Sequence, residues 1–278
     1  MKNLNCRKTI AVAALALSAL DLTLTPAVAA SPSANYRALS IFRKAAIDGN
    51  EIILAEDKEL RIPGTSKTRA DLAAGTRLTF ADAIRVRSQG KQYDLLLWNG
   101  LRPESSEEGG FAEAVSVLAV FPEGGATAID VAEVKTDRET YLAKSDLKLG
   151  DDEAFTIINA HLNAGQSYNI TDLFHLRDGR LRRVAEVFLL DNSGIKCVDV
   201  TREQLSWRAV ADGNELPRLV ATIELTRAPK EEKDCEGRAK ETRENFEGVF
   251  VWDAAKNAYR AESAAGLDRL QKWNEKHM

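Results

Sequence analysis

The sequence has few of the residues that most often carry chemistry. Of its 278 residues, three are histidine and three are cysteine, and aromatic residues make up only 6%. The chain contains no H-E-x-x-H, no C-x-x-C and no D-x-[DN]-x-[DN]-G motif. These absences remove the commonest sequence patterns for zinc and calcium sites, so we expect no metal and no cofactor.

Long hydrophobic runs are also scarce, and the one that exists lies at the N-terminus. A basic start precedes the apolar run TIAVAALALSAL (residues 9–20) and the small-residue pattern AVA (27–29). This order predicts a secretory signal peptide over residues 1–30, because the run is too short to cross a bilayer. No later segment approaches the roughly 20 apolar residues of a membrane helix. We therefore expect a periplasmic or secreted chain without a transmembrane segment.

The chain has no excess of positive charge. Its formal charge is −4, and it becomes −6 when the signal peptide removes three basic residues and Asp21. Binding to nucleic acid requires a concentrated basic surface, and so does electrostatic attachment to anionic lipid. We expect no nucleic-acid partner. The remaining partner class is an envelope component or another protein.

Two cysteines, Cys197 and Cys235, remain after cleavage. In an oxidising compartment such a pair predicts a disulfide, worth ~3–4 kcal/mol on the chain-entropy model. Zinc is the competing interpretation, and it fails because neither cysteine has closely spaced cysteine or histidine partners.

Hydrophobic periodicity predicts a mainly β fold with a helix at each end. Three- and four-residue spacing indicates helices over 33–48 and 264–276, the second with Ser263 as a candidate N-cap. Residues 51–75 show a mixed signal. After them the period changes to two, which predicts strands over 76–80, 83–87, 92–98, 113–121, 127–134, 153–162, 167–176, 181–190, 196–210, 217–227 and 246–252.

The expected architecture is an antiparallel β meander, closed or folded over as a barrel, a sandwich or a small propeller. We divide the chain into the signal peptide (1–30), a helix with an irregular segment (31–75) and a β-rich domain ending in a helix (76–278). The alternative is a single domain over 31–278.

The densest polar cluster is NAHLNAGQSYN, residues 159–169. A hairpin with its tip at Asn163–Gln166 places His161 opposite Tyr168 and Leu162 opposite Ser167. One face then carries Asn159, His161 and Tyr168, with Asp172 farther along. These four are our candidate ligand-binding residues. Two interpretations stay open: a polar rim whose groups are hydrogen-bonded within the fold, or a small concave site that binds a polar ligand.

The familiar catalytic patterns do not survive this geometry. Gly165–Asn169 nearly matches G-x-S-x-G, but the nucleophile elbow needs a helix after the serine, and Ser167 faces away from His161. Two S-x-x-K matches, at 145–148 and 193–196, lack a downstream K-T-G. Acidic residues at 130, 133, 137 and 139 are candidates for glycoside hydrolysis, but nothing selects two of them. We name no catalytic residue.

These observations favour a non-enzymatic periplasmic protein that binds an envelope component or another protein. The alternative is a hydrolase acting on a cell-wall or carbohydrate substrate through His161 or paired carboxylates. A cleft with a carboxylate within hydrogen-bond reach of His161 would favour the hydrolase.

The disulfide gives the first testable prediction. In protein exported to an oxidising compartment, Cys197 and Cys235 should resist alkylation until a reductant is added. Mass measurement of alkylated samples, with and without reduction, checks this. Two alkylated thiols before reduction would refute the disulfide.

Overall fold

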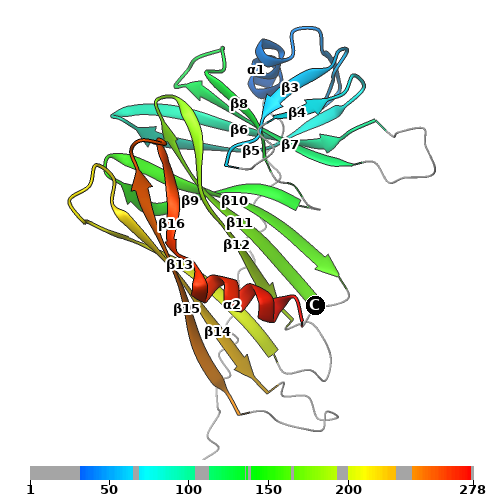
Figure 1. Cartoon of the computed structure of the whole chain (residues 1–278). Coiled ribbons are helices and arrows are strands. Elements are labelled where there is room, and N and C mark those ends of the chain that lie inside the picture. The colour runs from blue at the N-terminus through cyan, green and yellow to red at the C-terminus, as the bar shows by residue number, and fades with distance from the viewer. Residues whose placement is uncertain are drawn as a thin grey trace, which may run out of the picture.

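The computed structural model describes residues 32–64, 69–103, 113–134, 136, 139–163, 166–192, 200–229 and 240–276. The described chain forms two eight-stranded sheets with one helix on each (Figure 1). The expected signal peptide, both cysteines of the expected disulfide and the tip of the 153–176 hairpin lie outside the described residues. The mainly β fold with a helix near each end is confirmed.

The first sheet follows the helix α1 (Pro32–Ile41). Its strand order is β1-β2-β5-β6-β7-β8-β3-β4. Neighbours pair antiparallel except β3 and β8, which pair in parallel through Arg61 and Ala132. The strands are β1 (Ala46–Asp48), β2 (Glu51–Ile53), β3 (Lys58–Arg61), β4 (Arg69–Leu72), β5 (Arg77–Ser88), β6 (Lys91–Leu101), β7 (Ala114–Pro122) and β8 (Asp130–Val134).

The second sheet is a continuous antiparallel meander, as expected, and it curls into a half-barrel (Figure 1). The helix α2 (Ala265–Asn274) follows its last strand and crosses the sheet. The strands are β9 (Glu139–Leu149), β10 (Asp152–Asn163), β11 (Gln166–Arg177), β12 (Arg180–Asp191), β13 (Val200–Val210), β14 (Arg218–Ala228), β15 (Thr242–Asp253) and β16 (Ala258–Ser263).

The structure corrects several expected elements. The first helix ends at Ile41 instead of residue 48, because Ala46–Asp48 turns at Gly49 and pairs with β2. The mixed segment 51–75 forms three short strands that join the first sheet. Strands β9 and β16 were missed, since each is an edge strand with many exposed polar residues. Ser263 ends β16, and Ala264 is the N-cap of α2.

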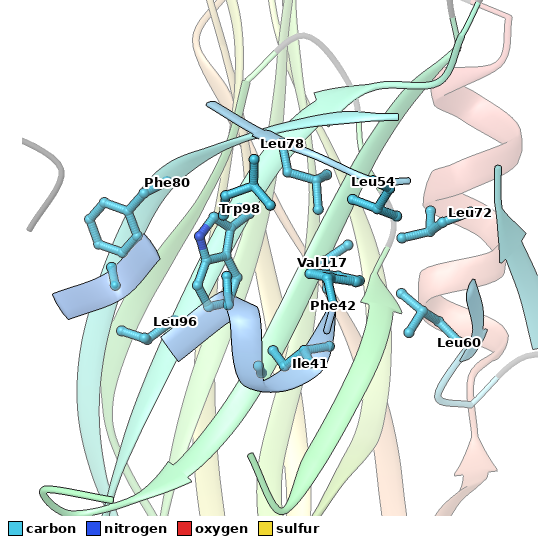
Figure 2. Packing of buried hydrophobic residues seen from close by; sticks show 14 of the residues in the cluster. Ile41, Phe42, Leu54, Leu60, Leu72, Leu78, Phe80, Leu96, Trp98 and Val117 are labelled. Atoms are coloured by element: carbon cyan, nitrogen blue, oxygen red, sulfur yellow. The ribbon is translucent and has the colours of Figure 1, made fainter. Parts of the chain in front are cut away.

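Strands β6 and β7 are buried on both faces and carry two hydrophobic cores. On one face, Trp98 and Val117 pack under α1 and the β3–β4 hairpin (Figure 2). On the other face, Leu97 and Leu118 pack against the second sheet through Phe155. This burial on both faces explains the continuous apolar runs of β6 and β7, which lack the alternation of a half-exposed strand.

A β-bulge lets β5 contribute to both cores. The register shifts between Phe80 and Asp82. Before the bulge, Leu78 and Phe80 belong to the core under α1; after it, Val86 belongs to the core between the sheets. Because side chains alternate along a strand, one inserted residue moves the following apolar residues to the opposite face.

The helix α2 closes the region where β12 and β13 separate. Among the described residues these strands pair at one position, Asp191 with Arg202. The N–H of Leu190 donates to Oε2 of Glu203 at 2.9 Å, and Nδ2 of Asn274 donates to the same oxygen at 3.1 Å. The carboxylate of Glu203 therefore replaces a backbone acceptor and holds the end of α2 on the sheet.

Two glycines allow α2 to lie close to β15. A Cβ on Gly248 would lie 2.4 Å from Cδ1 of Leu267, and a Cβ on Gly266 would lie 2.5 Å from the carbonyl oxygen of Glu247. At this distance Leu270 and Asn274 are buried.

Burial of Glu203 gives a prediction about pH. Burial raises the pKa of Glu203 from 4.5 to about 7. Between those values the folded protein binds more protons than the unfolded chain, so the free energy of unfolding should fall as pH rises, by up to about 3 kcal/mol. Glu203→Gln keeps an oxygen for Leu190 and should remove this contribution. Urea unfolding at pH 5 and pH 8 measures it.

A matched control is Asp146→Asn, which neutralises an exposed carboxyl on β9. This variant should keep the pH dependence of the native protein. If Glu203→Gln also keeps it, the proposed titration of Glu203 is wrong.

Candidate functional site

The expected hairpin forms with the expected register. His161 pairs with Tyr168 and Leu162 with Ser167, so the first prediction about the polar cluster is confirmed. The face that carries Phe155 and Asn159 points toward the first sheet, because Phe155 belongs to the core between the sheets. The polar end of this face therefore lies where the two sheets meet.

A cleft of about 800 Å³ opens at this junction, and His161 lines it. The opposite wall comes from the end of β6, the start of β7 and the segment before it. Gly100 is required there, since a Cβ would lie 1.9 Å from the carbonyl oxygen of Arg77 on β5. The lining residues are Asn99, Gly100, Leu101, Glu113, Ala114, Val115, Thr136 and His161.

Aromatic rings extend from this cleft across the second sheet. The rings of His161 and Tyr168 are nearly parallel, at 5° between planes and 4.7 Å between centroids. Tyr168 in turn stacks on Phe188 of β12, with centroids 5.3 Å apart. Each of these stacked pairs is worth about 0.5–1.5 kcal/mol beyond the area it buries. The imidazole of His161 is thereby held in one orientation at the edge of the cleft.

A chain of hydrogen bonds connects the two sheets behind the cleft. Ser116 Oγ donates to Oδ1 of Asn99 at 2.7 Å, and Nδ2 of Asn99 donates to the backbone oxygen of Thr140 at 2.8 Å. Thr140 Oγ1 donates to Oδ1 of Asn159 at 2.8 Å and lies 3.2 Å from Oγ1 of Thr136. We call these five residues the polar relay. It joins β7 and β6 to β9 and β10.

The relay ends at an amide that is incompletely satisfied. Asn159 is fully buried, and its Nδ2 has no hydrogen-bond acceptor among the described residues. A buried donor without an acceptor costs about 1–3 kcal/mol. Thr136, also in the relay, lines the cleft. The relay therefore contains both a cleft-lining hydroxyl and a buried amide with unused hydrogen-bonding capacity.

Asp172 lies apart from this group. It is buried and pairs with Arg183, whose Nη1 is 3.2 Å from Oδ1 of Asp172. The same guanidinium donates to the backbone oxygen of Gly64 at 2.6 Å, close to the β3–β4 hairpin. Asp172 thus anchors an arginine that joins the two sheets. The structure brings Asn159, His161 and Tyr168 together and does not bring Asp172 to the cleft.

Two of the four acidic residues considered for hydrolysis, Asp130 and Glu133, are bound by arginines, and Asp137 lies outside the described residues. Asp130 contacts Nη2 of Arg61 at 2.5 Å and accepts the N–H of Leu181 at 2.7 Å. Arg102 binds both oxygens of Glu133, at 2.7 and 2.9 Å. These contacts assign a structural role to both carboxylates.

The cleft itself contains one carboxylate among its described lining residues, that of Glu113. Its Oε2 lies 3.2 Å from Nε of Arg102. The arginine that binds Glu133 therefore also holds the acidic group of the cleft. A close carboxylate pair, as glycosidases use, is not formed by the described lining residues.

A second histidine is buried elsewhere in the second sheet. His175 contacts Trp252 and Tyr259 edge-on, with centroids 5.8 and 5.9 Å away. Burial, together with the positive charges of Arg177 and Arg182, lowers the pKa of His175 to about 3. The imidazole is neutral and enclosed, so we assign it to the core.

Sequence reasoning missed most of the relay. Asn99 and Ser116 lie in strands that are otherwise mostly apolar, and their polarity is the only feature that distinguishes them in the sequence. Thr140 lies on β9, a strand that was not expected. The available signal was the polar interruption of runs that are otherwise buried, which indicates a hydrogen-bonded group.

Neither the models of protein families nor the curated protein sequences match this chain. Within the described residues, no three histidine, cysteine or acidic side chains are grouped to hold a metal ion. No helix in that part of the chain is long and apolar enough to cross a membrane.

The two central residues of the cluster should differ in their effect on stability. Asn159→Ala removes the acceptor of a buried hydroxyl and should lower the free energy of unfolding by about 1–2 kcal/mol. His161→Ala removes a partly exposed ring from one stack and should cost about 0.5 kcal/mol, the lower end of the range for such a pair. Urea unfolding measures both, and equal losses would contradict this division.

Proposed function

We propose that this chain is an exported periplasmic protein that binds a neutral, hydroxyl-rich envelope component, such as a glycan segment, without catalysing a reaction. The observation that carries the proposal is the cleft lined by His161, with the polar relay behind it. Its volume, about 800 Å³, lies within the range of ligand pockets. The expected signal peptide supports the location.

The chemistry of the lining supports a neutral ligand. The amide of Asn99, the hydroxyl of Thr136 and the imidazole of His161 can exchange hydrogen bonds with hydroxyl and acetamido groups. The stack behind His161 fixes a flat ring against which the apolar face of a sugar can pack. The one acidic group, Glu113, is already paired with Arg102.

The alternative function is that of a hydrolase, because His161 lines the cleft and could act as an acid or a base. General acid–base cleavage of a glycosidic bond requires two carboxyl groups with different protonation states. The described lining provides Glu113 alone, and that carboxylate is ion-paired. The proposal therefore predicts binding without turnover.

Ligand-observed NMR with mature protein and chitotetraose, a soluble N-acetylglucosamine tetramer, tests the proposal. We expect saturation transfer to the sugar, with affinity reduced about tenfold or more in His161→Ala, because the variant loses a stacking face and a hydrogen bond. Tyr141→Ala is the matched control, since it removes an exposed ring from β9 outside the cleft.

Mass analysis of the same samples separates binding from hydrolysis. Shortened oligomers that disappear in His161→Ala would replace the binding proposal with the hydrolase. Absence of binding to both chitotetraose and solubilised peptidoglycan fragments would contradict a glycan ligand.

A further inference from the structure

The helix α2 is attached to the second sheet by few buried side chains. Of its ten residues, Leu270 and Asn274 are buried, and Leu267 and Trp273 are partly buried. A helix of this length is marginal in water without packing against the rest of the protein. Because one of the two buried side chains is polar, the hydrogen bonds of Asn274 contribute a large share of the docking.

The docked helix crosses the second sheet and covers an apolar surface of it (Figure 1). Leu270 belongs to one core cluster with Ile223 and Leu225 of β14 and Phe246 of β15. These three sheet residues have exposed fractions of 1–3% while the helix is docked. Release of α2 would therefore expose apolar surface that the docked helix keeps from water.

At the end of the helix, Asn274 shares one hydrogen bond with Glu203 of β13. Nδ2 of Asn274 donates to Oε2 of Glu203 at 3.1 Å, and the same oxygen accepts the N–H of Leu190 at 2.9 Å. The other two oxygens, Oε1 of Glu203 and Oδ1 of Asn274, are buried without a donor among the described residues. Each unsatisfied acceptor costs free energy, so an ionised Glu203 is an unfavourable partner for Asn274.

A single proton can satisfy both buried oxygens. An ionised carboxyl only accepts hydrogen bonds, whereas a protonated carboxyl also donates one. A proton on Oε1 would give Glu203 a donor for Oδ1 of Asn274, beside the bond that already joins Nδ2 to Oε2. The carboxyl and the carboxamide would then be joined by two hydrogen bonds in a ring.

The surroundings of Glu203 favour its protonated form. Burial raises the pKa of Glu203 from 4.5 to about 7, against the opposing effects of its two hydrogen bonds and of the charge of Arg227 on β14. The guanidinium of Arg227 lies 4.3 Å from the centre of the Trp273 ring, so this cation also contacts the helix. Charged side chains near Glu203 on β12, β15 and α2 are paired or exposed: Asp191 with Arg202, Glu244 with Arg269, and Lys272, Glu275 and Lys276 at the end of the helix.

We propose that Glu203 and Asn274 form a proton-dependent latch on α2. With a proton on Oε1 of Glu203, two hydrogen bonds join the side chains and the helix is docked. When this proton passes to solvent, the carboxylate has no donor to offer Oδ1 of Asn274, and the helix is released from the sheet in a larger fraction of the molecules. The latch makes exposure of the apolar surface under α2 depend on pH.

The sign of the pH dependence follows from the two environments of Glu203. The docked helix encloses the carboxyl and raises its pKa to about 7, whereas water solvates it after release and returns the pKa toward 4.5. The docked state therefore binds more protons between those values, and docking weakens by up to about tenfold per pH unit as pH rises. Above the pKa of the docked state, the dependence levels off.

Hydrogen exchange of the mature protein, followed by mass spectrometry of peptides from α2 and from β6 and β7, tests the latch. Each rate is divided by that of an unstructured chain at the same pH, which removes the intrinsic effect of hydroxide. This relative rate should rise about tenfold or more for α2 between pH 5 and pH 8. At pH 8 it should exceed the relative rate of β6 and β7 about tenfold or more, because release of the helix leaves the core closed.

Two variants test the paired oxygens directly. Glu203→Gln carries a permanent donor in place of the proton, because its amide nitrogen can donate to Asn274 while its oxygen accepts from Asn274 and Leu190. Its helix should stay as protected at pH 8 as the native helix is at pH 5. Asn274→Ala removes the partner, so its helix should exchange about tenfold or more faster than the native helix at pH 5. The matched control is Glu275→Gln, an exposed position one residue from the latch, which should exchange as the native protein does.

Three results would overturn the latch. Equal relative rates for α2 and for β6 and β7 at pH 8 would mean that the helix opens only when the whole fold unfolds. A native pH dependence in Glu203→Gln would assign the titration to another group. An unchanged rate for native α2 between pH 5 and pH 8 would separate the proton from docking. Binding of chitotetraose plays no part in these measurements, so this proposal and the proposed function are tested separately.

Discussion

The apolar layer between the two sheets is the contact on which the rest of the molecule depends. Leu97 and Leu118 of the first sheet meet Phe155 and Phe174 of the second, and all four are buried. This layer fixes the distance and angle between the sheets. The polar relay, the hydrogen bonds of Arg61 and Arg183 that cross the junction, and the cleft at His161 all require that placement.

The same face changes from apolar to polar along its length, and this change creates the cleft. Phe155 and Ile157 lie in the core, Asn159 follows in the relay and His161 lines the opening. Hydrophobic packing keeps the sheets closed at one end. At the other end, hydrogen bonds hold them together while the cleft stays open between them.

Buried acidic and basic side chains bind backbone groups where the strands stop pairing. Glu203 accepts the N–H that Leu190 would otherwise give to a neighbouring strand, and Arg183 joins Asp172 to Gly64. A buried N–H or carbonyl without a partner is costly, so side chains take over where strands diverge. These side chains are therefore parts of the fold.

Much of the fold could be predicted from periodicity, because alternation along a strand is a local property. The β10–β11 hairpin, its register and the shared face of Asn159, His161 and Tyr168 followed from turn length alone. The edge strands β9 and β16 and the short strands of the first sheet could not be found, because their pairing depends on distant partners more than on their own apolar pattern. The parallel contact of β3 with β8 likewise joins residues far apart in the chain.

By itself the sequence determined the fold class, the local register of the central hairpin and an expected export signal, since each depends on neighbouring residues. Tertiary structure alone decided which polar residues act together. Asn99 and Thr140 become hydrogen-bond partners, and Asp172 is drawn to Arg183 and away from His161, only when the sheets pack. The physical reason is that the geometry of a site between two sheets depends on how the sheets are placed relative to each other. That placement results from the many contacts of two cores, and no single residue determines it.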